Sequence, residues 1–458
     1  IRDSIGNPPY IRIQTMRDAG PPAAEYFKEA FATAGSGNYD IYVLFVERAL
    51  RLLNSKGSAG YILPSKFFAT DYGSALRALL TERSAVRAIA DFGHQQVFRG
   101  ATTYTCLLFL TTVRQDSIVY LAPVPPESLR EGTQAGRAIP GARLTAAAWS
   151  LGTDAANAVR QKATTGATPL LQLPCDIARG SSTGDDDVFM LAPATDGFAS
   201  RDGKRVHVEE SILRLPLYAS SISRYLFRPA ADERVIFPYH VSDDGYEPLS
   251  EDELRSEYPL AHRYLMSRRR RLELRKQYSE WYAYSAPRSL NVHDGAHFAV
   301  PLLANTGLYA PLPADRSKYC LMASGGFSIS LGPAATIAPN YVLGLLNSRL
   351  LFWLLKGMSH VFRGGWITCT KQYVGKLPVR MPADPESTRR HDKIAELVGS
   401  ILKLHQSELS AKLPQEKEQL RRQIEATDRQ IDQLVYELYG LNEAEIRIVE
   451  EAKSAANR

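Results

Sequence analysis

The first part of the chain alternates between apolar patterns typical of helices and of strands. Residues 40–57 (DIYVLFVERALRLLNSKG) carry apolar side chains at helical spacing and end in a glycine, which predicts a helix. Apolar runs at 60–68 (GYILPSKFF), in VRAIADF and at 102–113 (TTYTCLLFLTTV) are typical of buried strands, and SALRALLTE between the first two predicts a helix. Because strands alternate with helices, we expect an α/β layered domain with a mostly parallel sheet.

Changes in composition divide the chain into four regions. Residues 1–125 hold the α/β pattern, and residues 126–150, richer in proline, glycine and polar side chains, are predicted to be a linker. Residues 151–380 contain short, irregular elements with many glycines, prolines and aromatic residues, which predicts an α+β domain built largely of loops on short strands. Residues 381–458 are predicted to be helical.

Two helices are predicted in this last region. One begins at Asp384-Pro385 and reaches about Leu413, where Pro414 ends it. The other has its apolar positions spaced 4, 3, 4, 3 and 4 residues apart, which is a heptad pattern. Because the run is short, a hairpin packed on its own chain is favoured over a dimerising coiled coil. The heptad positions are Leu420, Ile424, Thr427, Ile431, Leu434 and Leu438.

Composition and charge set broad limits. At 458 residues, with 45% hydrophobic and 23% charged residues, the chain has the make-up of an ordinary globular protein with two or three domains. Its formal charge of +6 permits an acidic partner such as nucleic acid but does not demonstrate one. The longest apolar tract, which starts at Val342, is interrupted by Asn347, Ser348 and Arg349, so we expect a buried helix and no membrane span.

Cysteine and histidine spacing gives no sign of a metal site. The four cysteines lie far apart and form no CxxC pair, which argues against zinc or a disulfide framework and fits a reducing, cytoplasmic location. The histidines show neither HExxH nor HxH spacing, so no metal is predicted.

The residues with the most specific chemistry are Asn7, Pro8, Pro9 and Tyr10, which follow a glycine as NPPY. An asparagine amide oxygen and a proline carbonyl could accept both hydrogens of an exocyclic amine, and the Pro-Pro link would fix their directions. Tyr10 offers a face on which a flat base could stack. This set therefore predicts a pocket that holds a flat, polar base, and the alternative is a simple Pro-Pro turn.

IGNPPYIR resembles the catalytic motif of amino-methylating, S-adenosylmethionine-dependent methyltransferases. Nearly all of the remaining chain is similar to the gamma-class adenine-N6 DNA methyltransferases of bacterial restriction-modification, including TaqI-type and type IIG enzymes. The resemblance implies part of a Rossmann-like methyltransferase sheet, then an α+β target-recognition domain and a C-terminal helical hairpin. It also implies transfer of a methyl group from S-adenosylmethionine to a flipped adenine in double-stranded DNA, with residues 7–10 catalytic.

A phenylalanine is implied beside the catalytic loop. The segment DFGHQQVFRGATTYTCLLFL resembles one that supplies this side chain in the family, and Phe98 is the residue that matches. The resemblance implies that Phe98 packs on the flipped adenine together with Tyr10. The alternative is an aromatic residue of the hydrophobic core.

Segments of 151–380 resemble parts of the target-recognition domain. IARGSSTGDDDVFML looks like its GxxTGxNxxF segment, in which Thr183 is a candidate DNA contact and Asp186 replaces the usual asparagine. FRGGWITCTKQYVGKLPV combines glycines, cations and flat side chains in a way that suits a duplex surface, although a surface hairpin is the alternative. Its candidate residues are Arg363, Gly364, Gly365, Trp366, Lys371 and Tyr373. The run SRRRRLELRK (267–276) predicts either a phosphate-facing helix or a solvated helix face.

The glycine-rich turn that holds the methyl donor in this family precedes the catalytic loop, and only six residues precede Asn7. We therefore expect an N-terminally truncated chain that is inactive by itself, with the donor motif, and in type IIG enzymes a nuclease domain, upstream. Two alternatives stay open, a DNA-specificity module without catalysis and an NPPY methyltransferase acting on RNA or on protein glutamine. The sequence does not indicate the oligomeric state.

Overall fold

The chain folds into two compact units, which are described separately below. The computed structural model describes residues 1–35, 37–93, 95–98, 103–121, 124–132, 135–149, 151–228, 232–242, 245–288, 290–359, 361–362 and 365–454. The first unit contains Ile1–Asn157 and Gly357–Gly365, and the second contains Ala158–Lys356 and Trp366–Arg458. The predicted limits of the domains stay a prediction.

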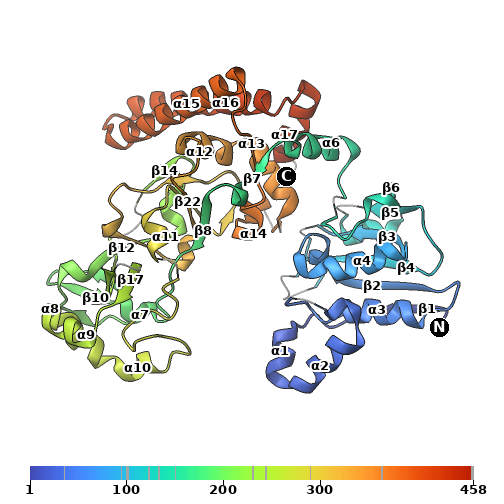
Figure 1. Cartoon of the computed structure of the whole chain (residues 1–458), viewed down its shortest axis with the longest axis horizontal. Coiled ribbons are helices and arrows are strands. Elements are labelled where there is room, and N and C mark those ends of the chain that lie inside the picture. Colours follow the sequence, from blue (N-terminus) through green and yellow to red (C-terminus); the bar gives the residue numbers. More distant parts are fainter. Residues whose placement is uncertain are drawn as a thin grey trace. The chain divides into compact units, whose positions relative to one another are not determined.

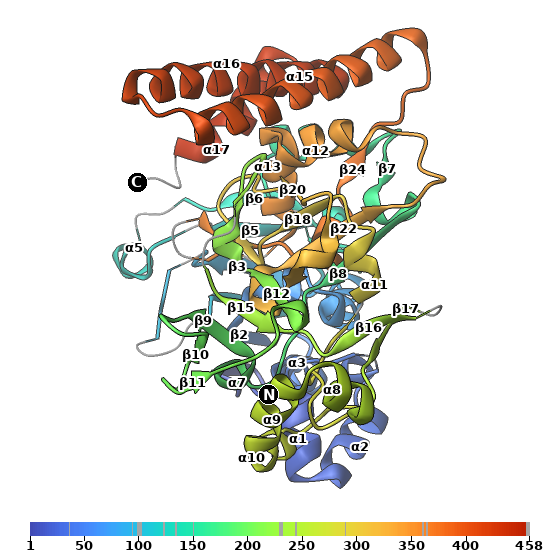
Figure 2. The same ribbon diagram turned by 90° about the vertical axis from the view of Figure 1, so that its left-hand side faces the viewer.

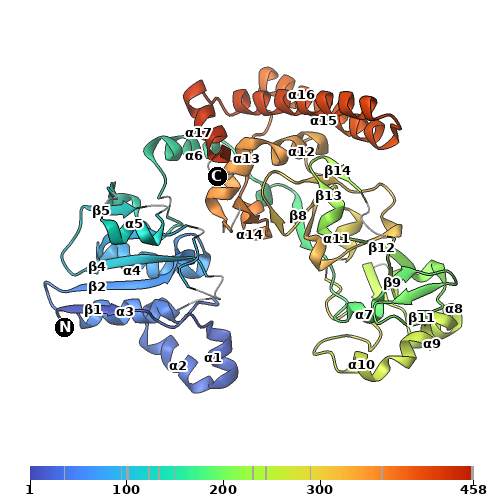
Figure 3. The ribbon, with the colours of Figure 1, turned by 180° about the vertical axis from the view of Figure 1, so that it is seen from behind.

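The first unit is built on a six-stranded sheet with the order β1-β2-β4-β3-β5-β6 (Figures 1 and 3). Its strands are β1 (Asp3–Gly6), β2 (Ser58–Pro64), β3 (Val86–Asp91), β4 (Thr105–Thr111), β5 (Ser117–Leu121) and β6 (Arg137–Pro140). Its helices are α1 (Ile13–Ala19), α2 (Pro21–Ala30), α3 (Tyr42–Leu52), α4 (Ser74–Glu82) and α5 (Pro126–Glu131), and α6 (Asp154–Thr164) runs across the boundary between the units.

The prediction of a mostly parallel sheet is wrong. β1 pairs in parallel with β2, and β3 with β5, but β4 is antiparallel to both of its neighbours, β2 and β3. β4 follows β3 without an intervening named helix, so the chain returns in the opposite direction instead of crossing over. The fold is mixed α/β with mixed sheets.

The structure also differs from the linker predicted at 126–150. This stretch contains α5 and β6, and β6 pairs antiparallel with β5 at the edge of the first sheet. Ile139 on β6 is fully buried in the same core as β2 and β4. The proline and glycine content that suggested a linker lies in the turns around these short elements.

The helix predicted at 40–57 is confirmed as α3, and its one buried charge organises the turn before it. Glu47 is 2% exposed and its carboxylate accepts hydrogen bonds from the backbone N–H groups of Ala32 and Thr33, at 3.1 and 2.8 Å, and from the Thr33 hydroxyl. Burial alone would raise the pKa of Glu47, but these hydrogen bonds and the Arg51 guanidinium lower it. The charged carboxylate thus fixes residues 31–34 against the helix.

The second unit contains a six-stranded sheet (β11-β10-β9-β15-β12-β21), a four-stranded sheet (β20-β18-β22-β8) and several two-stranded pairs. Its strands are β7 (Thr168–Pro169), β8 (Cys175–Arg179), β9 (Met190–Pro193), β10 (Phe198–Ser200), β11 (Arg205–Val206), β12 (Leu213–Leu217), β13 (Ile222–Ser223), β14 (Leu226–Phe227), β15 (Arg234–Ile236), β16 (Tyr239–Ser242), β17 (Gly245–Pro248), β18 (Phe298–Val300), β19 (Leu303–Ala304), β20 (Ala310–Pro311), β21 (Tyr319–Leu321), β22 (Phe327–Leu331), β23 (Ile367–Thr368) and β24 (Pro378–Val379). Its helices are α7 (Asp186–Phe189), α8 (Glu251–Glu257), α9 (Pro259–Ser267), α10 (Arg269–Glu273), α11 (Leu290–Asp294), α12 (Pro339–Asn347), α13 (Arg349–Met358, whose last two residues fall in the first unit), α14 (Lys371–Val374), α15 (Pro385–Ser410), α16 (Pro414–Leu438) and α17 (Glu443–Ser454).

α15 and α16 lie side by side, as both Figure 1 and Figure 2 show, and are joined by the short turn before Pro414. Asp384 caps α15 by accepting hydrogen bonds from the backbone N–H groups of Glu386 and Ser387. α12 packs closely on α15, because a Cβ at Gly344 would lie 2.7 Å from Cγ2 of Ile394. The two predicted helices are therefore present, and they pack within the second unit.

The apolar tract that begins at Val342 forms two helices, α12 and α13, and not the single helix expected. Of the polar residues at the break, Asn347 and Ser348 are buried and Arg349 is half-buried, and all three bond within the protein. The side-chain amide of Asn347 accepts a hydrogen bond from the N–H of Tyr309 (3.0 Å) and donates one to its carbonyl (2.9 Å). The backbone N–H of Arg349 donates a hydrogen bond to Oδ1 of Asp432 on α16 at 2.8 Å, and Nε of Arg349 forms an ion pair with Oδ2 of the same carboxylate at 3.0 Å. In the part of the chain that the structure describes, no helix combines the length and the hydropathy needed to cross a membrane.

Asp432 should make the stability of the second unit depend on pH. Burial raises the pKa of this carboxyl from 3.8 to about 6, and this effect outweighs the nearby Arg224 and Arg349. Because the folded state holds the proton more tightly than the unfolded chain, the contribution of this group is present below about pH 4 and is lost as the pH rises to about 6.

The test compares urea unfolding of the wild type and of Asp432→Asn at several pH values. Over this range the free energy of unfolding of the wild type should fall by roughly 3 kcal/mol relative to the variant. If the free energies of unfolding of the wild type and of Asp432→Asn differ by the same amount at every pH between 4 and 6, the expectation is contradicted.

Candidate active site

The NPPY loop begins where β1 ends. β1 runs parallel to β2, with Gly6 opposite Tyr61, and the next residue is Asn7. A Cβ at Gly6 would lie 2.7 Å from Cε1 of Tyr61, so glycine lets the end of the strand approach this ring. The Ser4 and Tyr61 hydroxyls are also within hydrogen-bond distance, 3.0 Å. β2 therefore positions the start of the loop.

Within the part of the chain that the structure describes, the polar atoms of the loop that were predicted to bind a base have no hydrogen-bond partner. Asn7 and Pro9 are exposed, whereas the Pro8 ring is buried. Among the described residues, neither the Asn7 side chain nor the Pro8 carbonyl oxygen takes part in a hydrogen bond. Prolines have no N–H group, so residues 8 and 9 add only acceptors to this surface.

A hydrogen bond from the Tyr10 hydroxyl and a ring contact fix the orientation of the Tyr10 ring. The hydroxyl donates a hydrogen bond to the carbonyl of Ile62 in β2, at 3.0 Å. The ring meets Tyr42 of α3 edge-on, with centroids 6.3 Å apart and planes at 81°. Burial, with a smaller contribution from Cys106, raises the pKa of Tyr10 to about 12, so the hydroxyl is neutral at physiological pH and serves as a donor.

The structure brings Phe98 next to Tyr10. The two ring centroids are 6.4 Å apart and the planes make an angle of 62°. Phe98 is half-buried, and the residues that follow it, 99–102, lie outside the described residues. Tyr10, which follows Asn7 and the two prolines in the loop, and Phe98, which is distant in sequence, thus form an edge-on aromatic pair within the first unit.

The candidate residues of the FRGGW segment have different environments. Arg363 and Gly364 lie outside the described residues. Gly365 has a positive φ of 75°, a conformation that favours glycine. Trp366 is 39% exposed, and Lys371 is exposed at the start of α14. These two side chains have surface that a partner could contact.

Two further candidates are buried, which corrects the expectation that they contact DNA directly. Tyr373 is 6% exposed and belongs to the interior of the second unit. Thr183 is fully buried; its hydroxyl donates to Asp186 (2.5 Å) and accepts from the N–H of Asp185 (3.1 Å). The apolar face of Tyr373 packs in the core, and Thr183 fixes the turn that precedes α7.

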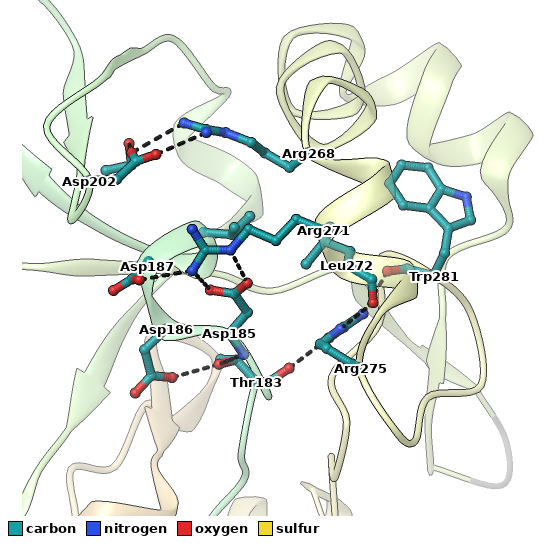
Figure 4. Close-up of polar contacts among 12 residues, drawn as sticks. Thr183, Asp185, Asp186, Asp187, Asp202, Arg268, Arg271, Leu272, Arg275 and Trp281 are labelled. Carbon is teal, nitrogen blue, oxygen red and sulfur yellow. Dashed lines mark hydrogen bonds and ion pairs between the residues drawn. The ribbon is translucent and has the colours of Figure 1, made fainter.

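A network of arginines and aspartates surrounds this turn (Figure 4). Arg271 of α10 donates to Asp185 at 2.5 and 2.8 Å and to Asp187 at 2.8 Å. Arg275 donates to the Thr183 carbonyl at 2.7 Å. The run SRRRRLELRK was predicted as either a phosphate-facing helix or a solvated helix face, and neither alternative describes these two guanidinium groups, which bond within the protein. The sequence contains the signal for this pairing in the three consecutive aspartates of TGDDD, but it does not show that the two segments meet.

Comparisons with known proteins find a family match within the first unit. Residues 5–98 match the family model of the Eco57I restriction-modification methylase. The chain is 25% identical over 474 residues to the type II restriction enzyme and methyltransferase RM.Eco57I of Escherichia coli, a match that covers 97% of this chain and 47% of that protein.

Two other comparisons extend over most of the chain. The type II methyltransferase M.PaeR7I of Pseudomonas aeruginosa is 24% identical over 425 residues, which cover 84% of this chain and 66% of that protein. The structure of the type IIL restriction-modification enzyme MmeI in complex with DNA matches 100% of this chain and 57% of its own, with a TM-score of 0.61 and 12% identity, and so shares the fold. The chain spans about half the length of RM.Eco57I.

The hydroxyl of Tyr10 should stabilise the first unit independently of any catalytic role. Tyr10→Phe keeps the ring but removes the hydrogen bond to Ile62, which should lower the free energy of unfolding by about 1 kcal/mol. Tyr26→Phe is the matched control, because Tyr26 is 62% exposed and should change stability by less than about 0.5 kcal/mol. Chemical denaturation measures both, and equal stability of Tyr10→Phe and the wild type would contradict the expectation.

Proposed function

We propose that this chain carries the catalytic loop and the DNA-recognition part of a site-specific adenine-N6 DNA methyltransferase of a restriction-modification system. The observation that carries this proposal is a pair of unpartnered acceptors, the Asn7 amide oxygen and the Pro8 carbonyl oxygen, beside the fixed ring of Tyr10. The relationship to restriction-modification methyltransferases supports it.

The acceptor pair suits the chemical difficulty of the reaction. The N6 lone pair of adenine is delocalised into the ring, so this nitrogen is a weak nucleophile. If the Asn7 amide oxygen and the Pro8 carbonyl oxygen each accept one N6 hydrogen, the nitrogen becomes more electron-rich and its lone pair turns out of the ring plane. The protein's part is positioning and electrostatic stabilisation, and no covalent intermediate with a side chain is required.

Tyr10 and Phe98 would hold the ring of the adenine. A base inside a duplex is inaccessible, so the adenine must leave the stack at a cost of a few kcal/mol. Stacking on an aromatic face returns about 1–3 kcal/mol per base. The Tyr10 ring is already fixed by Ile62 and Tyr42, so little side-chain entropy is lost when the base binds.

S-adenosylmethionine is a reactant in this proposal, and it supplies an electrophilic methyl group to N6. The sequence of this chain contains no GxGxxG turn that would hold the donor. Assays of methyl transfer should therefore supply a donor-binding part together with this chain. The residues of this chain act on the adenine.

Duplex DNA is proposed as the partner of the second unit. Trp366 and Lys371 are exposed there and combine a flat face with a positive charge, which suits contact with a nucleic-acid surface. The alternatives, methylation of RNA or of protein glutamine, have no comparable support, since the related proteins are type II restriction-modification enzymes.

Asn7→Ala should lower kcat for methyl transfer by about a thousandfold or more, because one of the two N6 acceptors is lost at the transition state. The affinity for cognate duplex should change less than about threefold, since Asn7 is a small part of the DNA contact. Asn7→Asp, which keeps an acceptor oxygen, should retain more activity than Asn7→Ala. Transfer of labelled methyl groups and fluorescence anisotropy with labelled duplex measure the two quantities.

Asn54→Ala is the matched control for this experiment. Asn54 is an exposed asparagine whose backbone N–H bonds to Ile1, before the start of β1 and away from the NPPY loop. Its replacement should leave kcat unchanged. Methyl transfer by Asn7→Ala at the rate of this control would rule the proposal out.

A further inference from the structure

Six cations lie in the run 267–276, and the structure separates them into two groups. Arg268 pairs with Asp202 at 2.9 Å, and Arg271 pairs with Asp185 and Asp187 (Figure 4). Arg269 pairs with Glu273 at 2.8 Å. Arg275 points inward and donates to backbone carbonyls. Arg270 and Lys276 are exposed and have no ion pair within the described part of the chain. Two of the six cationic side chains, those of Arg270 and Lys276, are therefore without a partner among the described residues.

The segment that carries these two cations is held firmly in place. The guanidinium of Arg275 bonds to four carbonyl oxygens, those of Leu272 (2.9 Å), Thr183 (2.7 Å), Ala283 (2.8 Å) and Trp281 (2.6 Å). These bonds tie the end of α10 to the TGDDD turn and to residues 281–283. A side chain presented from this segment would lose little backbone freedom on binding.

Leu274 lies between Arg270 and Lys276 in the sequence and is 84% exposed. Leu272, two residues earlier, is fully buried, so one leucine of this short segment packs in the core and the other is exposed to solvent. An exposed apolar side chain on a rigid segment between two free cations is the combination found where proteins contact a nucleic-acid groove.

We propose that residues 270–276 contact duplex DNA, with Arg270 and Lys276 on backbone phosphates and Leu274 against the sugars or base edges between them. This inference rests on the proposed function, and it assigns part of the DNA surface to a segment outside the FRGGW region. A polyanion complements the two unpaired charges of Arg270 and Lys276. The arginines that bond within the protein hold the segment in place.

Salt dependence provides the first test. Each phosphate contact contributes about 0.9 to the slope of log Kobs against log salt concentration. The double variant Arg270→Gln/Lys276→Gln should therefore bind DNA with a slope smaller by about 2, and should lose affinity equally on cognate and non-cognate duplexes. Anisotropy titrations of the protein, together with any sequence encoded upstream, measure the slope. Arg422→Gln is the matched control, because Arg422 is a 78% exposed cation on α16.

The leucine provides the second test. Leu274→Ala should weaken DNA binding by about three- to tenfold while the salt slope stays at the wild-type value, because an apolar contact releases no counterions. Leu413→Ala, at a leucine that is 66% exposed between α15 and α16, should leave affinity unchanged. Thermal melting of each variant checks that the fold is intact.

The outcomes separate this inference from the proposed function. If the wild type binds and methylates DNA but the double variant keeps the wild-type slope, residues 270–276 do not contact phosphates and only this inference fails. If Leu274→Ala binds as tightly as Leu413→Ala, the leucine contact fails. If the wild type neither binds duplex DNA nor transfers methyl groups, the proposed function fails and this inference fails with it.

Discussion

Two consecutive prolines at the end of β1 determine the character of the candidate site. Each proline lacks a backbone N–H, so residues 8 and 9 present carbonyl acceptors without donors of their own, and their fixed φ angles limit how these acceptors can turn. Among the described residues, no donor forms a hydrogen bond to the Pro8 carbonyl oxygen or to the Asn7 amide oxygen. The loop is complementary to a ligand that brings its own N–H groups, and an exocyclic amine is such a ligand.

The rest of the first unit holds this loop still. Gly6 allows β1 to lie close to Tyr61, and the hydroxyl of Tyr10 reaches the backbone of β2. The position of Phe98 depends on the antiparallel strand β4, because the loop that carries Phe98 connects β3 to β4. The mixed sheet therefore matters for the site: it brings a residue of a late loop to the ring of an early one.

Much of this could be predicted from the sequence, and the failures have physical causes. Helix α3, the Asp384 cap and the two C-terminal helices follow from local patterns, and the unusual composition of NPPY makes it the candidate catalytic loop. Strand direction does not, because an apolar run such as TCLLFL has the same pattern in a parallel or an antiparallel strand. The α5 and β6 region was predicted as a linker because these elements are short and lie between turns rich in proline and glycine.

The sequence also could not show which polar side chains are buried. Thr183 and Tyr373 occur in segments that suggest DNA contact, yet both side chains face inward. The arginine run shows the same limit from the opposite side, since its partners Asp185, Asp187 and Asp202 lie more than sixty residues earlier in the chain. A count of charges in one segment cannot show which of them are neutralised by a distant segment.

The polar break between α12 and α13 has a consequence for how the chain can be shortened. Arg349 and Arg224 both direct their guanidinium groups to carboxylates of α16, Asp432 and Asp428. A protein ending before α15 would leave these two cations without counterions and uncover the apolar side of α12 against which Ile394 rests. The C-terminal helices are thus part of the hydrophobic core of the second unit. Their removal would expose that core, so the second unit should not fold without them.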